Sequence, residues 1–188
     1  MIDNTDAMKA SGIIRRIDDL GRVVIPKEIR RTQRWREGDP IEILPLKSGD
    51  VLLRKYSDIE GIESLVSHTA KSLSAMLDDI SVLICDDTKF VSVAGSKSSK
   101  LVGHKLSVKL MDKIIKGTDI QLLQPSIPLV DENIENQKNY CSQVLAPIIV
   151  DGISMGAIIL ISIKREMQQR DLVAVETAAR LIAANLEL

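Results

Sequence analysis

The chain has 188 residues, of which 45% are hydrophobic and 27% are charged, and its net charge is −1. These values predict a globular protein of one or two domains. No stretch approaches the roughly 18 uninterrupted apolar residues of a membrane-spanning helix, and residues 1–10 lack the apolar region of a secretory signal, so we expect a cytoplasmic protein without membrane contacts.

Charge is distributed unevenly along the chain. Residues 1–55 contain 12 Lys and Arg with 9 Asp and Glu, whereas residues 56–188 contain 13 and 17. Within residues 9–36, nine basic side chains are accompanied by only three acidic ones. This pattern indicates an anion-binding module followed by a neutral to acidic one, although a solvated charged surface would give the same balance.

The N-terminal quarter alternates short apolar and basic runs. β-Branched residues predict strands over residues 11–17 and 22–25, on either side of an Asp-Asp-Leu-Gly turn. In that turn we expect Gly21 to adopt a positive φ. Pro26 favours the start of a helix over residues 27–34.

A second hairpin is predicted over residues 41–46 and 51–56, across a Lys-Ser-Gly-Asp turn. The unit that ends there is small, and a unit of fewer than about 60 residues buries too little apolar surface to be more than marginally stable alone. We therefore expect the apolar strands of two copies to interleave in an obligate dimer.

The rest of the chain alternates helices and strands. Apolar residues recurring every three or four positions predict helices, and runs of Val, Ile and Leu predict strands. Polar residues with two prolines predict a loop over residues 125–140. The order indicates an antiparallel sheet covered by helices. The expected helices are residues 58–77, 107–116 and 168–186, and the expected strands are residues 81–85, 89–94, 143–150 and 155–163.

Several motifs resemble a known family. MKASGIIRRIDDLGRVVIPKEIRRT, followed by EGDPIEI and LLRKY, closely resembles the AbrB-type DNA-binding domain. Through SVLICDD, VAGSKSSKLVGHKLS and AVETAARL, the resemblance extends to the stage V sporulation protein T (SpoVT) family, and it covers nearly all of the chain from Met8 onward. Gln33 and Trp35 depart from the aliphatic residues of the family pattern, and residues 1–7 precede its usual start.

The resemblance implies an α+β protein with two domains. A swapped-hairpin β-barrel dimer at residues 8–56 would follow a tail at residues 1–7 and precede a GAF-like domain at residues 57–188. It implies a nucleoid-associated transcription regulator of sporulation genes that binds double-stranded DNA and assembles as a homotetramer. It also implies which side chains of the barrel contact DNA: Arg15, Arg22, Arg30 and Arg31, with Lys9 and Arg16 in the same basic set.

Arginine suits such contacts because its planar guanidinium binds phosphate in a bidentate manner and can read the edge of guanine. A purely structural alternative is that one or two of these arginines pair with Asp18, Asp19 or Glu28. For Arg16 the two interpretations are evenly balanced.

For the GAF-like half, a small-molecule ligand and no ligand are equally consistent with the sequence. A GAF-like fold often encloses a pocket between its sheet and a loop, and residues 125–140 could cover one. No cofactor or metal-binding set is evident, and His68 and His104 are expected at the surface. The apolar stripes of the first and last predicted helices could instead contact a second copy.

Two alternative functions remain open. An antitoxin-type autorepressor would use a similar barrel, but it would usually carry a short disordered tail in place of a folded half. A GAF-fold thiol reductase would need reactive cysteines. Cys85 and Cys141 each adjoin an aliphatic strand, where cysteine more often serves as a small buried hydrophobe, so we expect no enzyme activity.

Overall fold

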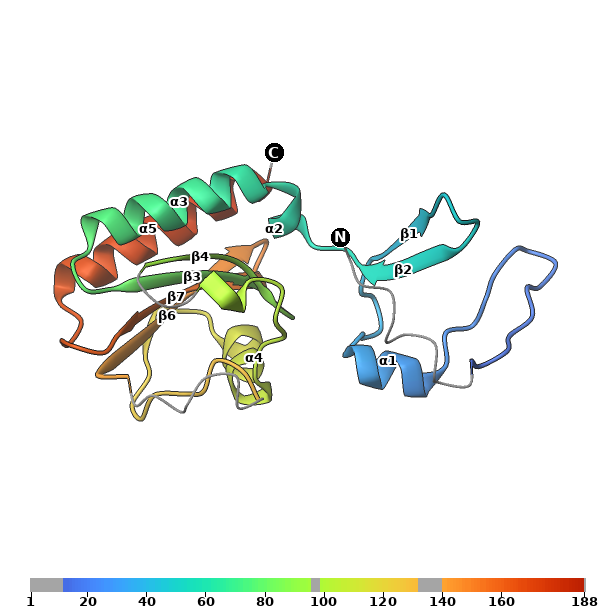
Figure 1. Ribbon diagram of the computed structural model, residues 1–188, viewed down its shortest axis with the longest axis horizontal. Coiled ribbons are helices and arrows are strands. Elements are labelled where there is room, and N and C mark those ends of the chain that lie inside the picture. The colour runs from blue at the N-terminus through green and yellow to red at the C-terminus, as the bar shows by residue number, and fades with distance from the viewer. Residues whose placement is uncertain (1–11, 96–98, 132–139, 188) are drawn as a thin grey trace. The chain divides into compact units, whose positions relative to one another are not determined.

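The computed structural model describes residues 12–95, 99–131 and 140–187 (Figure 1). The chain divides into two compact units, Met1–Lys55 and Tyr56–Leu188. Within the described ranges, no helix is long and apolar enough to cross a membrane.

The N-terminal unit contains one short helix and one hairpin. Helix α1 spans Lys27–Gln33, and β1 (Ile41–Pro45) pairs antiparallel with β2 (Val51–Lys55). Pro26, at φ −59°, precedes the helix, where its missing N–H costs no hydrogen bond and its carbonyl accepts from the N–H of Arg30.

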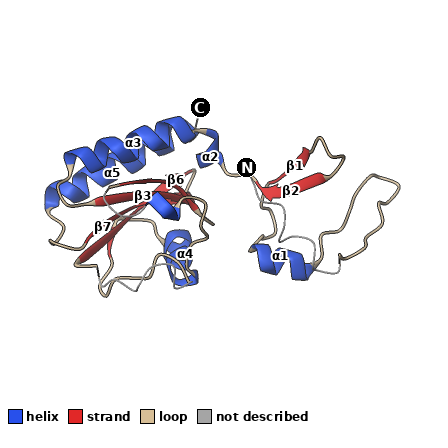
Figure 2. Ribbon diagram, in the orientation of Figure 1, coloured by secondary structure: helices blue, strands red, loops and turns tan. Residues whose placement is uncertain are grey.

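The predicted strands over residues 11–17 and 22–25 were wrong for the single chain. Their described residues form irregular arms on either side of a tight turn, and Figure 2 draws them as loop. Asp18 closes the turn by accepting hydrogen bonds from the N–H groups of Leu20 and Arg22, and Gly21 has the expected positive φ of 75°. The arms are not strands because the described part of the chain provides no neighbouring strand for them.

The C-terminal unit is built on a five-stranded antiparallel sheet in the order β4-β3-β7-β6-β5. Each predicted strand is present, with end positions shifted by at most two residues. The short strand β5 was not predicted, because two residues give no periodic pattern. The strands are β3 (Ser81–Asp86), β4 (Phe90–Ala94), β5 (Gln121–Leu122), β6 (Ser142–Val150) and β7 (Ile153–Ser162).

Helices cover both faces of this sheet (Figure 1). Helices α2 (Asp58–Gly61), α3 (Glu63–Met76) and α5 (Gln169–Leu186) lie on one face, and α4 (Val108–Lys116) lies on the other, with a short 3₁₀ turn at Ser99–Leu101. Alternation along β3 divides the core: Val82 and Ile84 pack toward α3 and α5, and Leu83 and Cys85 pack toward α4.

The predicted helix over residues 58–77 is two helices in the structure. Ile62, at φ −112° and ψ 34°, separates α2 from α3. The break lets α2 turn onto the sheet, where Ile59 is 1% exposed and lies against Gly156, whose position has no room for a Cβ. Apolar periodicity runs through the break because both helices contribute to one core.

Candidate nucleic-acid interface

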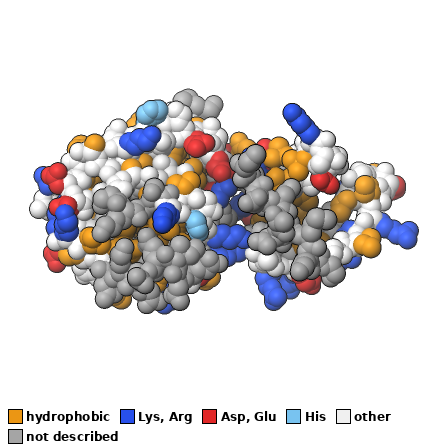
Figure 3. All heavy atoms as spheres, in the orientation of Figure 1, with side chains coloured by type: hydrophobic (Ala, Val, Ile, Leu, Met, Phe, Trp, Pro, Cys, Tyr) orange, Lys and Arg blue, Asp and Glu red, His pale blue; other side chains and the backbone are white. Residues whose placement is uncertain are grey.

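The predicted DNA-contacting side chains lie on two elements of the N-terminal unit. Arg15, Arg16 and Arg22 flank the turn between the two arms, and Arg30 and Arg31 lie in the last turn of α1. All five are exposed, and Figure 3 shows Lys and Arg side chains along the outer surface of this unit. Lys9 lies outside the described residues.

Arg22 forms an ion pair with Asp18, one of the acidic partners that the sequence analysis considered. Its Nε lies 2.7 Å from Oδ2 of Asp18, and its own backbone N–H also donates to Asp18. These hydrogen bonds, the backbone one first, lower the pKa of Asp18. Because a guanidinium has five N–H donors, Arg22 keeps donors for a phosphate while Asp18 fixes its position.

The other arginines of this set are not paired with carboxylates of the described chain. No Asp or Glu oxygen of the described residues lies within 4.0 Å of Arg15, Arg16, Arg30 or Arg31. Positive charge therefore gathers at the turn and at the end of α1, as a polyanion-binding surface requires.

The same arms expose large apolar side chains. Ile14 is 90% exposed and Val24 is 73% exposed, and several apolar side chains of the β1–β2 hairpin are also exposed. So many large apolar side chains exposed on one small unit indicate a site of interaction with another chain. The remaining exposed apolar residues of the unit include Ile13, Ile17, Leu20, Val23, Ile43, Val51, Leu52 and Leu53.

In the C-terminal unit, apolar side chains pack the space between the sheet and α4. Phe90, Leu110, Leu145 and Ile159 are at most 1% exposed there. Residues 127, 129 and 130 of the segment 125–140, which could cover a ligand pocket, pack on this face. Residues 132–139 of that segment lie outside the described residues.

The described residues at the start of segment 125–140 are held against the core by hydrogen bonds. Buried Gln143 accepts from the N–H of Ile127 at 2.6 Å and donates to the Ile127 carbonyl at 3.2 Å. The hydroxyl of Ser107 donates to the Pro128 carbonyl at 2.6 Å, and Leu129 is 2% exposed beneath it. These contacts make residues 127–129 part of the core wall.

The cysteines do not form a redox pair. Cys85 is fully buried, its thiol donates to the Ala157 carbonyl at 3.5 Å, and burial raises its pKa far above the usual range. Cys141 immediately precedes β6 and lies six residues from Pro147, which pairs with Ala157, the partner of Cys85 on the neighbouring strand. At roughly 3.3 Å per residue the two thiols are about 20 Å apart.

The histidines differ from each other. His68 is exposed on α3, as expected, with Nδ1 2.7 Å from the Ser64 carbonyl. His104 is half-buried, with Nδ1 enclosed and unpartnered, because its loop pairs with the start of β4. Among the described residues, no three His, Cys, Asp or Glu side chains gather closely enough to hold a metal ion.

Comparison with protein families and curated proteins covers both units. A family model described as stage V sporulation protein T C-terminal, transcription factor, matches residues 62–187, and one for MazE bacterial antitoxins matches residues 14–60. Stage V sporulation protein T of Bacillus subtilis is 40% identical over 183 residues, which are 96% of this chain and 99% of that protein. The transition state regulatory protein AbrB of Bacillus subtilis is 49% identical over 49 residues, which are 26% of this chain and 50% of that protein.

Solved structures match the C-terminal unit. The cofactor-binding GAF domain of the nutrient sensor CodY from Clostridium difficile has a TM-score of 0.50 at 15% identity, covering 64% of this chain and 83% of that one. A type II free methionine-R-sulfoxide reductase from Thermoplasma acidophilum has a TM-score of 0.51 at 16% identity, covering 68% and 94%. These likenesses show the fold alone and confirm the expected GAF-like domain after an AbrB-type one. The family model that matches residues 62–187 and the near full-length likeness in sequence place the chain in the stage V sporulation protein T family of transcription factors.

Proposed function

We propose that the protein binds specific sites in duplex DNA and regulates sporulation genes through its N-terminal domain, residues 8–56. The observation that carries this proposal is the set of exposed arginines of this domain, of which Arg22 is held by Asp18 and the others have no carboxylate partner among the described residues. Arg15, Arg22, Arg30 and Arg31 are assigned the main contacts, and Lys9 and Arg16 belong to the same surface.

A dimer would supply what the single chain lacks. The arms expose apolar side chains and have no neighbouring strand in the described chain. Interleaving them with the arms of a second copy would pair their backbones and bury Ile and Val side chains, at about 1.5–3 kcal/mol for each one fully buried. The charged side chains would then remain on the outside of a shared barrel.

Arginine contacts to phosphate predict a steep dependence of affinity on salt. If all eight main arginines of a dimer neutralise phosphates, log K should fall against log salt with a slope of about −7, since each contact contributes about 0.9. Arginines that contact bases instead would make the slope shallower and the sequence preference sharper.

The test compares the wild type with Arg30→Ala/Arg31→Ala by fluorescence anisotropy on duplex DNA, over salt concentrations from about 50 to 200 mM. The matched control is Lys109→Ala/Lys113→Ala, which removes two exposed cations of α4 in the other unit. Salt-steep binding that only the arginine variant loses, while its oligomeric state is retained, supports the proposal. Equal binding by all three proteins would refute it.

The GAF-like domain, residues 57–188, is assigned signal sensing, tetramer assembly or both. Met76 of α3 and Val173 and Leu181 of α5 are 61%, 53% and 52% exposed, which favours a helical contact between copies. Sedimentation of the full chain at micromolar concentration should then give a tetramer that Leu181→Glu converts to a dimer. A wild type that sediments only as a dimer would count against this assembly.

An antitoxin-type repressor is the second candidate because an antitoxin model matches residues 14–60. That match covers the N-terminal unit, whereas the likeness to stage V sporulation protein T covers 96% of the chain. The wider likeness favours the sporulation regulator.

A further inference from the structure

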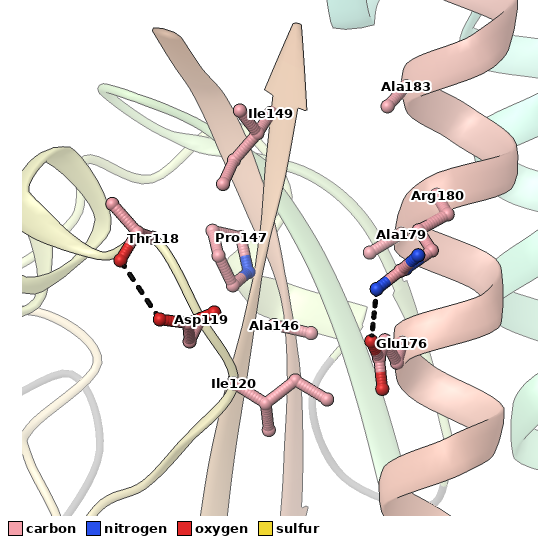
Figure 4. A pocket seen from close by; sticks show the side chains of 10 residues that line it. All are labelled: Thr118, Asp119, Ile120, Ala146, Pro147, Ile149, Glu176, Ala179, Arg180 and Ala183. Atoms are coloured by element: carbon pink, nitrogen blue, oxygen red, sulfur yellow. Dashed lines mark hydrogen bonds and ion pairs between the residues drawn. The ribbon is translucent and has the colours of Figure 1, made fainter. Parts of the chain in front are cut away.

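A groove of about 260 Å³ lies between strand β6 and helix α5, on the sheet face opposite α4 (Figure 4). The segment before β5 forms its third side. Its lining residues are Thr118, Asp119, Ile120, Ala146, Pro147, Ile149, Glu176, Ala179, Arg180 and Ala183.

Pro147 is the reason that the groove is open. Gln121 pairs with Leu145, and the N–H of Leu123 donates to the Gln143 carbonyl, so the odd-numbered residues of β6 direct their hydrogen-bonding groups toward β5. In this register Asp119 would be the next partner, opposite Pro147. Proline has no N–H to complete that pair, so the ladder stops and residues 118–120 separate from β6.

The groove has an apolar floor. Ala146 of β6 is 1% exposed, and Ala179 and Ala183 of α5 are 3% and 8% exposed. Alanine at these positions leaves space that a larger side chain would fill, and the half-buried Ile120 borders it. This floor fits a short aliphatic group.

Charges of both signs stand at the mouth. Nη2 of Arg180 lies 2.7 Å from Oε1 of Glu176 along α5, and the Arg180 side chain is 79% exposed. Asp119 lies on the opposite side and accepts a hydrogen bond from the Thr118 hydroxyl at 3.1 Å. Since a guanidinium has five N–H donors, Arg180 can hold a second anion without leaving Glu176.

We propose that this groove binds a small zwitterion of the aliphatic α-amino acid class. The ligand carboxylate pairs with Arg180, its ammonium pairs with Asp119, and its side chain lies on the alanine floor. A volume of about 260 Å³ is below the range of roughly 300–1,000 Å³ that is typical of sites for drug-sized ligands, which argues against a nucleotide or a tetrapyrrole.

Such a ligand would contact both α5 and the segment before β5, which lie on opposite sides of the groove. Binding would therefore stiffen the end of the sheet beside α5. This consequence for regulation rests on the sensing role proposed above, but the binding itself does not.

The experiment measures binding to the full-length protein by isothermal titration calorimetry, with L-alanine, L-valine and L-methionine as probes. Isobutylamine and isovalerate present the ammonium and the carboxylate of valine separately, each on the same carbon skeleton. The variants Arg180→Gln and Asp119→Asn each remove one charge at the mouth, and Lys113→Gln and Asp112→Asn are matched controls on α4.

At least one amino acid should bind, and each mouth variant should weaken it at least about tenfold, as loss of a charged hydrogen bond does. The controls should bind like the wild type. The proposal is overturned if no probe binds at concentrations up to about 10 mM, since a dissociation constant above that value corresponds to a binding free energy weaker than about −3 kcal/mol. It is also overturned if both mouth variants bind with unchanged affinity, or if isobutylamine or isovalerate binds as tightly as valine. DNA binding measured on the same samples separates these outcomes from failure of the proposed function, because Arg180→Gln leaves the N-terminal arginines intact.

Discussion

Replacing Arg165 by Met should strongly destabilise the C-terminal unit, because the guanidinium neutralises a buried carboxylate. Asp171 is 0% exposed, and Arg165 binds it through Nη1 at 2.6 Å and Nη2 at 3.1 Å. The N–H of Gln168 donates to the same carboxylate at 2.7 Å, which caps α5. Arg165 also donates to the Asp78 carbonyl and so ties the start of α5 to the connection before β3.

Removing one partner of a buried ion pair costs about 3–5 kcal/mol, since the other charge stays buried and unpaired. At about 3 °C for each kcal/mol in a unit of this size, the melting temperature should fall by roughly 10–15 °C. Arg170→Met is the matched control. Its Nε lies 3.8 Å from Asp171 and its side chain is 61% exposed, so its loss should cost less than about 0.5 kcal/mol.

The same pair predicts a dependence of stability on pH. Burial raises the pKa of Asp171, but the hydrogen bonds from Arg165 and Gln168 outweigh it and hold the pKa below its usual range. A carboxylate with a depressed folded-state pKa stabilises the fold above its unfolded pKa of about 3.9, and this contribution is lost as pH falls through the folded-state pKa.

Urea denaturation followed by far-ultraviolet circular dichroism measures both effects. The difference in unfolding free energy between the wild type and Asp171→Asn should be constant above about pH 5 and should shrink below about pH 4. A loss of less than about 1 kcal/mol in Arg165→Met would refute the assignment of a buried, charge-dependent clamp. The assignment would also be refuted if the difference in unfolding free energy between the wild type and Asp171→Asn did not change on acidification.

Three further predictions concern the C-terminal unit. Gly156→Ala should lower the urea midpoint far more than Gly12→Ala, because the added Cβ would overlap the Cys85 carbonyl oxygen, whereas nothing lies within 4 Å at Gly12. Pro147→Val should extend β5 and close the groove, seen as new amide protection in hydrogen exchange at residues 119 and 147 together with loss of amino acid binding. Unchanged protection would contradict the role given to Pro147. In the native protein a thiol reagent should modify exposed Cys141 promptly and Cys85 only upon unfolding, and rapid reaction of both would reopen the reductase interpretation.

The sequence by itself determined the elements whose signals are local. Periodic apolar residues predicted α4 and α5, with Ser107 and Gln168 as their N-caps in the structure, and runs of Ile, Leu and Val predicted the four long strands of the sheet. The motifs of the first 56 residues were specific enough to identify an AbrB-type domain, which the comparisons then confirmed.

Tertiary structure decided what depends on partners distant in sequence. Residues 12–17 and 22–25 have strand-like composition, but a strand also needs a neighbour, and the described chain gives them none. Conversely, β5 exists because β6 lies beside it, and it ends where Pro147 removes the next hydrogen bond. Backbone pairing and burial are set by the register between segments, which composition and periodicity do not encode, so the groove beside α5 became visible only in the folded molecule.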